Sequence, residues 1–574
     1  MASPKSDAPS PPSLHENEDL CKTILCTVIS TAGLMIRKSK ILNAGSGLFA
    51  TNDLDEGQLV YQSLPFLFSV GDDDGVCIKN VCDYCYASSL DRVHVDGHFY
   101  GEKDRKPALN LCAGCKSCSY CSKACQERAW KQWHKAECKV LKHAQPLRAS
   151  LRLLYRLLML QKSDRLSTAH LHALTLMKFN EAEYKTADCS NLENIIDSVK
   201  VATGTTLSSR EILVLLYKIV TNGFSIVQAD YSGGMGSLGG CVDLTGAVLR
   251  HSCTPNAFYF FEGRELQVRT LRVIPAGEEI SISYVNINSS YLQRSGVLWN
   301  VYHVACACLK CQGQLKQLSQ WDAESPGGDL SFLRNLTQAE IALSNIFLNK
   351  VAGLAMTKNK NPEDKINHPE DKIDNPEDKI DSPKDKIDSP EDKIDNPEAQ
   401  IENLTMTVFP NGDWPDDLAP LPALRTKCAL LYSKQGEQQK ALRLILKSCT
   451  TLGRGDGTEY LAALLIVLKC LAPFMYAGTR PKDLPKDFPI LKEVKDVYTG
   501  YSYTSVRFAT KLFGDDNRYA RALGGQHMDH LSANGSPRVH SGSFQKKFRL
   551  AQGKLLAWAG IEDFKKMVLH AVAE

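Results

Sequence analysis

The residues best suited to chemistry are cysteines and a histidine that recur at short spacings. Eight of them form four close pairs, Cys82-x2-Cys85, Cys112-x2-Cys115, Cys121-x3-Cys125 and His134-x3-Cys138. Thiolate and imidazole are ligands that zinc prefers, and each pair supplies two corners of a tetrahedron from one tight turn. The spacing therefore predicts two structural zinc sites, and structural zinc contributes on the order of 10 kcal/mol to folding.

A third cysteine group lies downstream, Cys306-x-Cys308-x2-Cys311. It offers three thiolates, whereas a closed structural zinc site takes four ligands. A distant residue completes the site, or the zinc has three protein ligands, or the thiols carry no metal. Spacing alone leaves these alternatives open.

Three further stretches have residue types that suit ligand binding. Gly45 and Gly47, in Asn43–Ala50, allow the backbone to turn sharply and to approach a ligand closely. Downstream lie Arg250-His-Ser-Cys-Thr-Pro-Asn256 and Gly277-Glu-Glu-Ile-Ser-Ile-Ser-Tyr284. Each stretch also has a purely structural explanation: most G-x-G pairs are simple turns, and Tyr284 could be an ordinary strand aromatic.

Taken in order, these pieces resemble a SET domain, the fold that carries protein-lysine methylation, and the paired cysteines resemble a MYND zinc finger. The resemblance covers most of residues 38–315. It implies an α+β fold in which a MYND finger and a helical insert interrupt a β-rich SET domain. A C-terminal α-helical, tetratricopeptide-like domain follows.

The resemblance also implies how the metal ligands are grouped. In MYND fingers the pairs interleave, and in SET-and-MYND proteins the cysteine of the H-S-C stretch completes the third site. This gives about three zinc ions per chain. The implied ligand sets are Cys82, Cys85, Cys121 and Cys125; Cys112, Cys115, His134 and Cys138; and Cys253, Cys306, Cys308 and Cys311.

The active-site roles implied by the resemblance follow from the same motifs. Tyr284 would orient the target amine, and Tyr302 and Phe224 would wall a channel for the target lysine. The methyl donor would be S-adenosylmethionine. Its expected contacts are Gly45, Ser46, Gly47, Asn222, Arg250, His251, Tyr284 and Val304.

Two of these positions depart from the family pattern. SET-and-MYND enzymes usually have asparagine where this chain has Arg250, so a group that donates and accepts is replaced by a cation that only donates. They commonly have phenylalanine, stacking on adenine, where this chain has Val304. Both changes fall on the expected donor pocket.

Composition sets the broad class. The chain has 574 residues, 43% hydrophobic and 23% charged, with a net charge of +3, which is too mild to indicate a nucleic-acid or membrane partner. Eleven of the twenty cysteines fall in short groups or at spacings that complete them, which favours zinc thiolates in a reducing compartment over disulfides. The apolar run Leu20–Ile36 is short and contains Lys22, which favours a buried helix or strand over a membrane segment. We expect a soluble intracellular protein of the nucleus, the cytoplasm or both.

Sequence patterns divide the chain as follows. Apolar residues spaced three and four apart predict helices after the finger and again near the C-terminus. A seven-residue repeat, beginning Asn361-Pro-Glu-Asp-Lys-Ile-Asn367, has a proline in every copy and predicts a solvated linker rather than a coiled coil. The predicted regions are a disordered N-terminus (1–19), the first SET part (36–81), the MYND finger (82–138), a helical insert (145–218), the second SET part (219–290), a post-SET zinc segment (291–315), a disordered repeat linker (357–408) and a helical domain (415–574).

Two functions of different class agree with these observations. The first is an S-adenosylmethionine-dependent protein-lysine N-methyltransferase that acts on histone tails or other proteins. The second is a degenerate SET and MYND adaptor whose finger recruits proline-containing peptides. In MYND fingers Gln126 and Trp130 occupy the matching groove positions, although Trp130 could merely cover the zinc core.

Overall fold

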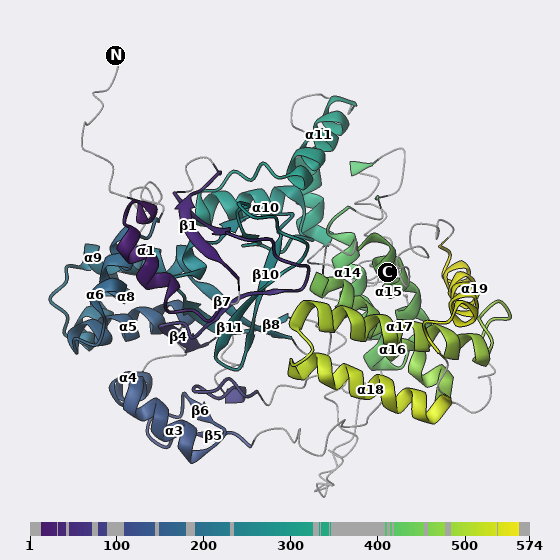
Figure 1. Cartoon of the computed structure of the whole chain (residues 1–574), viewed down its shortest axis with the longest axis horizontal. Helices are drawn as coiled ribbons and strands as arrows, with labels where there is room; N and C mark the ends of the chain where they lie inside the picture. The colour runs from purple at the N-terminus through teal and green to yellow at the C-terminus, as the bar shows by residue number, and fades with distance from the viewer. Residues whose placement is uncertain are drawn as a thin grey trace, which may run out of the picture.

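The computed structural model describes most of the chain outside the repeat linker. Figure 1 shows the strands gathered in the N-terminal half and a body of helices formed by the C-terminal residues. The predicted α+β class is confirmed. The described residues are 13–30, 32–41, 45–71, 79–88, 108–143, 148–179, 190–229, 235–324, 332, 334–343, 345, 408–409, 414–415, 418–452, 457–476, 484–535 and 538–561.

Regular structure begins nearer the N-terminus than the sequence predicted. A 3₁₀ turn at Leu14–Glu16 and helix α1 (Glu18–Leu25) lie within or begin within residues 1–19, which were expected to be disordered. Leu20, Cys21 and Ile24 of α1 are buried in the core of the sheets. The prediction was wrong for residues 13–19 because a polar sequence hides this apolar contact. Residues 1–12 and the repeat linker, up to residue 407, lie outside the described residues.

The glycine turn joins two paired strands. Strand β1 (Leu34–Lys38) is antiparallel to β2 (Ser46–Ala50), with Lys38 opposite Ser46. Gly45 has φ +83°, a left-handed conformation that favours glycine. A Cβ on Gly47 would lie 2.1 Å from a carboxylate oxygen of Glu279, so the Glu279 side chain would have to move to admit a larger residue there. The backbone conformation therefore favours glycine at position 45, and the contact with Glu279 favours it at position 47.

The other strands form small sheets that bring distant motifs together. Strands β9 (Arg250–His251) and β12 (Ser281–Ile282) pair in parallel, with Ile282 opposite His251. This pairing places the H-S-C stretch beside the stretch that ends at Tyr284. The remaining sheets have the orders β10-β11-β3 and β4-β8-β7, with β3 (Leu59–Ser63), β4 (Leu67–Val70), β7 (Phe224–Ala229), β8 (Met235–Val242), β10 (Ala257–Glu262) and β11 (Glu265–Thr270).

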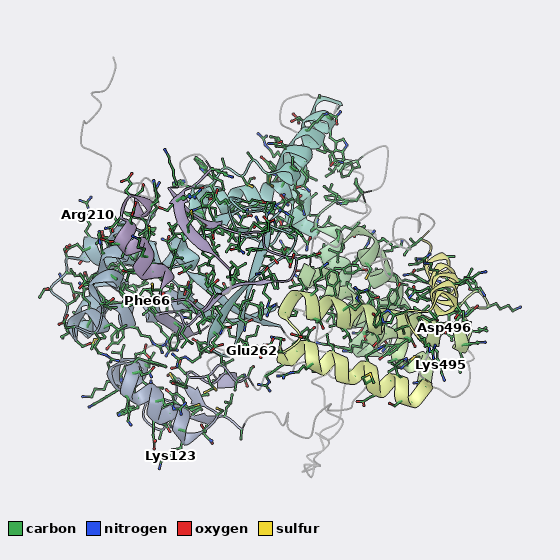
Figure 2. All side chains as sticks on the ribbon, viewed as in Figure 1. Phe66, Lys123, Arg210, Glu262, Lys495 and Asp496 are labelled. Carbon is green, nitrogen blue, oxygen red and sulfur yellow. The ribbon has the colours of Figure 1, made fainter. Side chains whose placement is uncertain are left out.

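Strand β10 belongs to two cores. Because side chains alternate along a strand, Phe258 and Phe260 pack into the helical C-terminal body, whereas Tyr259 and Phe261 pack into the core of the sheets. Glu262, labelled in Figure 2 at this junction, accepts hydrogen bonds from Asn517 and the Arg518 backbone. The all-aromatic run in β10 therefore joins the two parts of the molecule.

The finger and the helical insert follow the predicted order. Ser122 caps the helix α3 by accepting from the Cys125 backbone N–H. Asn222, a predicted contact of the methyl donor, is the last residue of α9 (Ser209–Asn222). This helix begins with a capping box between Ser208 and Glu211. The finger contains β5 (Asn110–Leu111), β6 (Ser119–Tyr120), α3 (Lys123–Ala129), a π-helical turn (Trp130–His134) and α4 (Lys135–Leu141). The insert contains α5 (Ala149–Lys162), α6 (Thr168–Leu176), α8 (Ser190–Thr203) and α9 (Ser209–Asn222).

The C-terminal part is helical, as predicted. Helix α16 (Gly457–Tyr476) is apolar and long enough to cross a membrane, but 72% of its most apolar window is buried, as expected for the central helix of a packed bundle. After the sheets come α10 (Tyr291–Val297), a π-helical turn (Leu298–Tyr302) and α11 (Leu309–Glu324). The C-terminal body contains, besides α16, α14 (Leu421–Gln435), α15 (Gln438–Thr451), α17 (Leu491–Phe513), α18 (Arg518–Asn534) and α19 (Gly542–Trp558).

Two buried histidines between α17 and α18 predict acid sensitivity of this body. Burial, with the nearby His527 and Lys495 charges, lowers the pKa of His530 to about 4, and its Nε2 lies 2.8 Å from the Thr499 hydroxyl. An unfolded histidine has a pKa of about 6.5. Between about pH 6.5 and 4 the unfolded chain therefore binds a proton that the folded chain excludes, and stability falls as pH falls.

The expected result is a smaller loss of thermal stability on acidification in His530→Gln than in wild type, because glutamine can still bond Thr499 but does not titrate. Unfolding midpoints of both proteins at pH 7.5 and 5 measure this. Equal losses would contradict the assignment.

Candidate active site and zinc centres

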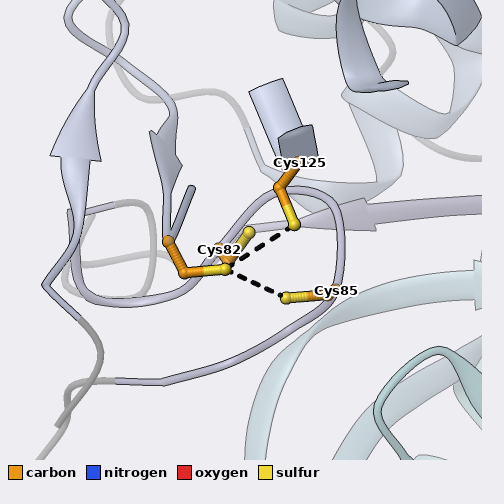
Figure 3. A group of neighbouring side chains, drawn as sticks. Cys82, Cys85 and Cys125 are labelled. Atoms are coloured by element: carbon orange, nitrogen blue, oxygen red, sulfur yellow. Dashed lines mark hydrogen bonds between the residues drawn. The ribbon is translucent and has the colours of Figure 1, made fainter. Parts of the chain in front are cut away.

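Three groups of metal-ligand side chains converge, with the membership that the family resemblance implied. Within each group all ligand atoms lie within 4.8 Å of one another. Figure 3 shows Cys82, Cys85 and Cys125 pointing toward one centre. The groups are Cys82, Cys85, Cys121 and Cys125; Cys112, Cys115, His134 and Cys138; and Cys253, Cys306, Cys308 and Cys311.

The spacing of these ligand atoms suits tetrahedral zinc. Zinc–sulfur bonds of about 2.3 Å put neighbouring sulfurs roughly 3.8 Å apart, and disulfide sulfurs lie only about 2.0 Å apart. The Sγ–Sγ distance is 3.6 Å for Cys121–Cys125 and 3.5 Å for Cys253–Cys311. Each group could therefore hold a zinc ion.

A buried arginine contacts the third group. The guanidinium of Arg294 is buried, with Nε 3.4 Å from the Cys253 sulfur and Nη2 3.9 Å from that of Cys311. A cation there offsets the negative charge of a four-thiolate site. Nothing in the sequence singled out Arg294, since it is one arginine within an ordinary helical pattern.

Cys118, left out of the predicted ligands, adjoins the second group: its ligand atom lies within 4.8 Å of those of His134 and Asp83. It is buried beside Asp83 and His134, and Nη2 of Arg152 lies 3.5 Å from its sulfur.

Four buried charges join the finger to the helical insert. Arg152 contacts Asp83 and Glu137 at 3.0 Å each, and Arg156 contacts the same carboxylates at 3.1 and 2.7 Å. Burial alone would raise the pKa of Asp83, but the two guanidinium groups hold it down to about 2. We call these four residues the finger–insert charge network. Asp83 and Glu137 each adjoin a predicted zinc ligand, so the network fixes the finger against α5.

A cavity of about 890 Å³ opens beside the third cysteine group. Its size is within the range of small-molecule sites. All three predicted catalytic residues line it, and so do five of the predicted donor contacts; the glycine turn does not. The predicted residues that line it are Phe224, Tyr284, Tyr302, Asn222, Arg250, His251 and Val304.

His251 fixes the backbone of Tyr284. Its Nδ1 accepts from the Tyr284 backbone N–H at 3.0 Å, and its Nε2 lies 3.2 Å from the Cys253 sulfur. Burial lowers the pKa of His251 to about 4, so the ring is neutral and its proton is on Nε2. The centroids of the His251 and Tyr284 rings lie 5.3 Å apart. One imidazole thus connects the third cysteine group to the cavity.

The phenol of Tyr284 is itself held in place. It donates to the Leu249 carbonyl, and its ring lies 4.9 Å from that of Tyr302. Burial raises the pKa of Tyr284. At neutral pH it is therefore a protonated, fixed polar group rather than a general base.

Arg250 lines the cavity, and its guanidinium donates to two backbone carbonyls and lies beside the Tyr284 phenol. Its Nε donates to Ser46 at 2.5 Å and its Nη2 to Ala247 at 3.4 Å. The arginine that replaces the family asparagine thus connects the glycine turn to the H-S-C stretch.

Ser46 also joins the glycine turn to the N-terminal segment. Its hydroxyl accepts from the His15 backbone N–H at 3.0 Å and lies 3.0 Å from the His15 ring Nδ1. We expect Ser46→Ala to lower the free energy of unfolding by about 1–2 kcal/mol, because it leaves these groups without their partner. Denaturant unfolding measures this. His15→Ala should cost less, since its backbone bond remains, and the reverse order would contradict this account.

Sequence reasoning missed several cavity residues. One of them is Lys178, whose backbone carbonyl accepts a hydrogen bond from the Asn222 side-chain amide at 2.8 Å. Tyr259 packs edge-on against Phe224 with 5.0 Å between centroids. Trp299 lines the cavity while 56% exposed, beside His303, which has φ +54°. Only the exposed tryptophan so close to the cysteine group could have served as a sequence signal.

Comparisons with known proteins agree with this geometry. A family model for the SET domain matches residues 45–285. Histone-lysine N-methyltransferase SMYD3 of Mus musculus is 28% identical over 312 residues, 52% of this chain. The SET domain and MYND-type zinc finger protein 6 of Schizosaccharomyces pombe is 26% identical over 273 residues, 47% of this chain. The chain thus contains a SET domain and is similar to SET and MYND domain-containing proteins over about half of its length.

Another relative matches over a similar part of the chain. N-lysine methyltransferase SMYD2-A of Xenopus laevis is 27% identical over 283 residues, 47% of this chain. The match spans 64% of the mouse SMYD3, 59% of SMYD2-A and 50% of the yeast protein. Their names describe SMYD3 and SMYD2-A as lysine methyltransferases.

Proposed function

We propose that this chain is an S-adenosylmethionine-dependent protein-lysine N-methyltransferase. The activities named for SMYD3 and SMYD2-A support the reaction class. The observation that carries the proposal is the convergence of Tyr284, Tyr302 and His251 on one cavity. The substrate would be a lysine in a histone tail or in another protein, and the site of action would be the nucleus, the cytoplasm or both.

Tyr284 would orient the target amine. Its hydroxyl hydrogen already points to the Leu249 carbonyl and the Arg250 side chain bonds the same oxygen, which leaves one lone pair to accept from an amine N–H. Tyr302 and Phe224 would wall the lysine channel. Fixed polar groups of this kind need no reorganisation during reaction, which is the source of their catalytic effect.

The target amine must be neutral to attack. A free lysine has a pKa of about 10.4, so removing its proton at pH 7 costs roughly 4–5 kcal/mol. The rings of Phe224, Tyr259 and Tyr302 in the cavity wall disfavour the charged amine by desolvation. The amine would release its proton to water and then form the new nitrogen–carbon bond.

S-adenosylmethionine, when bound, supplies the methyl group on a sulfonium that leaves as a neutral thioether. The residues that would hold it are those that line the cavity and the glycine turn, whose Ser46 carbonyl accepts a hydrogen bond from Arg250. The proposed contacts are Gly45, Ser46, Gly47, Asn222, Arg250, His251, Tyr284 and Val304.

We further propose three zinc ions per chain, one in each cysteine group. Metal analysis of the purified protein should give about three equivalents. Cys253→Ala should give about two, because it leaves the third group with three thiolates. A matched change at Cys241, a buried cysteine outside all the groups, should leave three. Equal metal content in the two variants would contradict the third site.

The proposal is tested by transfer of a radiolabelled methyl group from S-adenosylmethionine to histones and to lysate proteins. Methylation of lysine by wild type is the expected result. Calorimetry with S-adenosylmethionine separates loss of donor binding from loss of chemistry.

A second function is favoured by the finger. Trp130 is 42% exposed on the π-helical turn, although its ring also lies 5.9 Å from His134. An exposed indole beside Gln126 suits a proline-containing peptide. If wild type gives no heat with S-adenosylmethionine but Arg250→Asn does, the chain acts as an adaptor that recruits such peptides, and the enzymatic proposal fails.

A further inference from the structure

A buried carboxyl group lies next to the turn that precedes the H-S-C stretch. Asp243 directly follows strand β8 and is only 4% exposed. Its Oδ1 accepts from the Gly246 backbone N–H at 2.6 Å. Its Oδ2 accepts from the hydroxyl of Ser63, in strand β3, at 2.7 Å. The carboxyl group therefore joins the sheet that contains β3 to the 3₁₀ turn Gly246–Val248.

Hydrogen bonds keep this carboxyl group in a place that disfavours its charge. Burial raises the pKa of Asp243, and the bonds from Ser63 and from the Gly246 backbone oppose that rise. Gly246 is itself buried, and a buried backbone N–H without a partner is costly. The conformation of the turn therefore depends on the Asp243 side chain.

A continuous series of hydrogen bonds leads from Asp243 to the cavity. The Gly246 carbonyl accepts from the Leu249 backbone N–H at 2.9 Å. The Leu249 carbonyl in turn accepts from the Tyr284 hydroxyl. Because each bond fixes the direction of the next, the Tyr284 phenol is aligned by a carboxyl group that does not line the cavity.

The same turn supports two other residues of the cavity wall. The Ala247 carbonyl accepts from Arg250 Nη2 at 3.4 Å, and the Arg250 side chain also bonds the Tyr284 oxygen. Phe224 packs on Gly246, where an added Cβ would lie 2.8 Å from the phenylalanine ring. A displacement of the turn would therefore disturb Phe224 and both groups that contact the Tyr284 phenol.

We propose that Asp243 is a positioning residue for methyl transfer, which holds the turn Gly246–Val248 so that the Leu249 carbonyl and Arg250 align the Tyr284 phenol. This inference rests on the proposed function and extends it to a residue outside the cavity. Misplacing a group at a reacting centre by roughly 1 Å can cost about 100-fold in rate, because the reactants lose their alignment. Asp243 acts through Tyr284 and not on the substrate.

Single-turnover methyl transfer at saturating S-adenosylmethionine measures the effect. Asp243→Ala should lower the rate about 10- to 100-fold, because the turn loses the acceptor for the Gly246 N–H. Asp243→Asn should keep the rate within about threefold of wild type. Its amide oxygen can still accept from Gly246, and the Ser63 hydroxyl can rotate to accept from the amide nitrogen.

Donor affinity separates alignment of the phenol from collapse of the cavity. Calorimetry with S-adenosylmethionine should show a change of less than about fivefold in both variants, because the bond from Arg250 Nε to the Ser46 carbonyl does not involve the turn. A loss of donor binding as large as the loss of rate would overturn the positioning role.

A spectroscopic readout follows the phenol without any reaction. 3-Fluorotyrosine placed at position 284 alone gives one fluorine resonance, whose chemical shift depends on the hydrogen bonds of the phenol. Asp243→Ala should move this resonance, whereas Asp243→Asn should leave it near its wild-type position.

Two control variants separate positioning from loss of stability. Gln552→Ala removes a buried side chain that bonds the Tyr501 hydroxyl in the helical body, so it should lower thermal stability and leave the rate and the resonance unchanged. Ser63→Ala should lower the rate only about 2- to 10-fold, because the bond to Gly246 remains. If Asp243→Ala does not fold, Ser63→Ala carries the test, and an unchanged rate and resonance in it would overturn the proposal.

Each outcome decides a separate question. If wild type transfers no methyl group but Asp243→Ala moves the resonance, the proposed function fails and the alignment of Tyr284 by Asp243 stands. If wild type is active and folded Asp243→Ala keeps its rate and resonance, the positioning role is wrong and the proposed function stands. An equal loss of rate in the Ala and Asn variants also overturns the positioning role, since the amide keeps the bond to the turn.

Discussion

Replacing Tyr284 with phenylalanine is expected to lower the rate of methyl transfer about 100- to 1,000-fold. The change removes one hydroxyl that the Leu249 carbonyl holds in place beside the ring of Tyr302. Loss of one preorganised polar group at a reacting centre usually costs about that factor. The ring itself remains, so its contact with His251 and the shape of the cavity should persist.

Single-turnover transfer of a radiolabelled methyl group, compared at saturating donor, measures this effect. Donor affinity should change little, because the hydroxyl is assigned to the amine rather than to the donor. Tyr503→Phe, which removes an exposed hydroxyl bonded to His540 in the helical body, serves as the matched control and should leave the rate unchanged. A Tyr284→Phe enzyme of normal rate would remove this residue from the mechanism.

Replacing Arg156 with methionine is expected to lower the free energy of unfolding by about 3–5 kcal/mol. Arg156 is buried and contacts both Asp83 and Glu137. Its loss leaves two buried carboxylates facing the single guanidinium of Arg152, and an uncompensated buried charge is costly. Since each carboxylate adjoins a zinc ligand, the finger should detach from α5 before the sheets unfold.

Denaturant unfolding at a fixed zinc concentration measures the loss, and hydrogen exchange of residues 108–143 locates it. Lys123→Met provides a contrast within the same finger. The Lys123–Glu127 pair is exposed and 4.0 Å apart, and Lys123 is labelled at the finger surface in Figure 2. This change should cost less than about 1 kcal/mol. Equal effects of the two changes would show that the buried network does not hold the finger.

The sequence alone was enough for the features that depend on short spacing. Pairs such as Cys121 and Cys125 have only two or three residues between their members, so local geometry fixes which ligands come from one element. The helices of the insert and of the C-terminal body followed from apolar periodicity.

Features made by residues far apart in sequence needed the tertiary structure. Arg156 pairs with Asp83 only because α5 lies against the finger, since the two residues are 73 positions apart in the sequence. His15 was assigned to a disordered segment, yet it bonds Ser46, and the helix α1 that follows it buries Leu20, Cys21 and Ile24. Lys178 is one lysine among many until Asn222 places its backbone beside the cavity.

What the sequence by itself determined was therefore the chemistry that this chain has available: zinc-binding thiolates, a glycine turn, and the His251 and Tyr284 stretches in SET order. Only the tertiary structure decided which charges meet, and hence how Arg250 is accommodated. The physical reason is that ligand pairs and helical faces are set by local backbone geometry, whereas ion pairs and cavity walls depend on the packing of elements whose sequence separation carries no signal of contact.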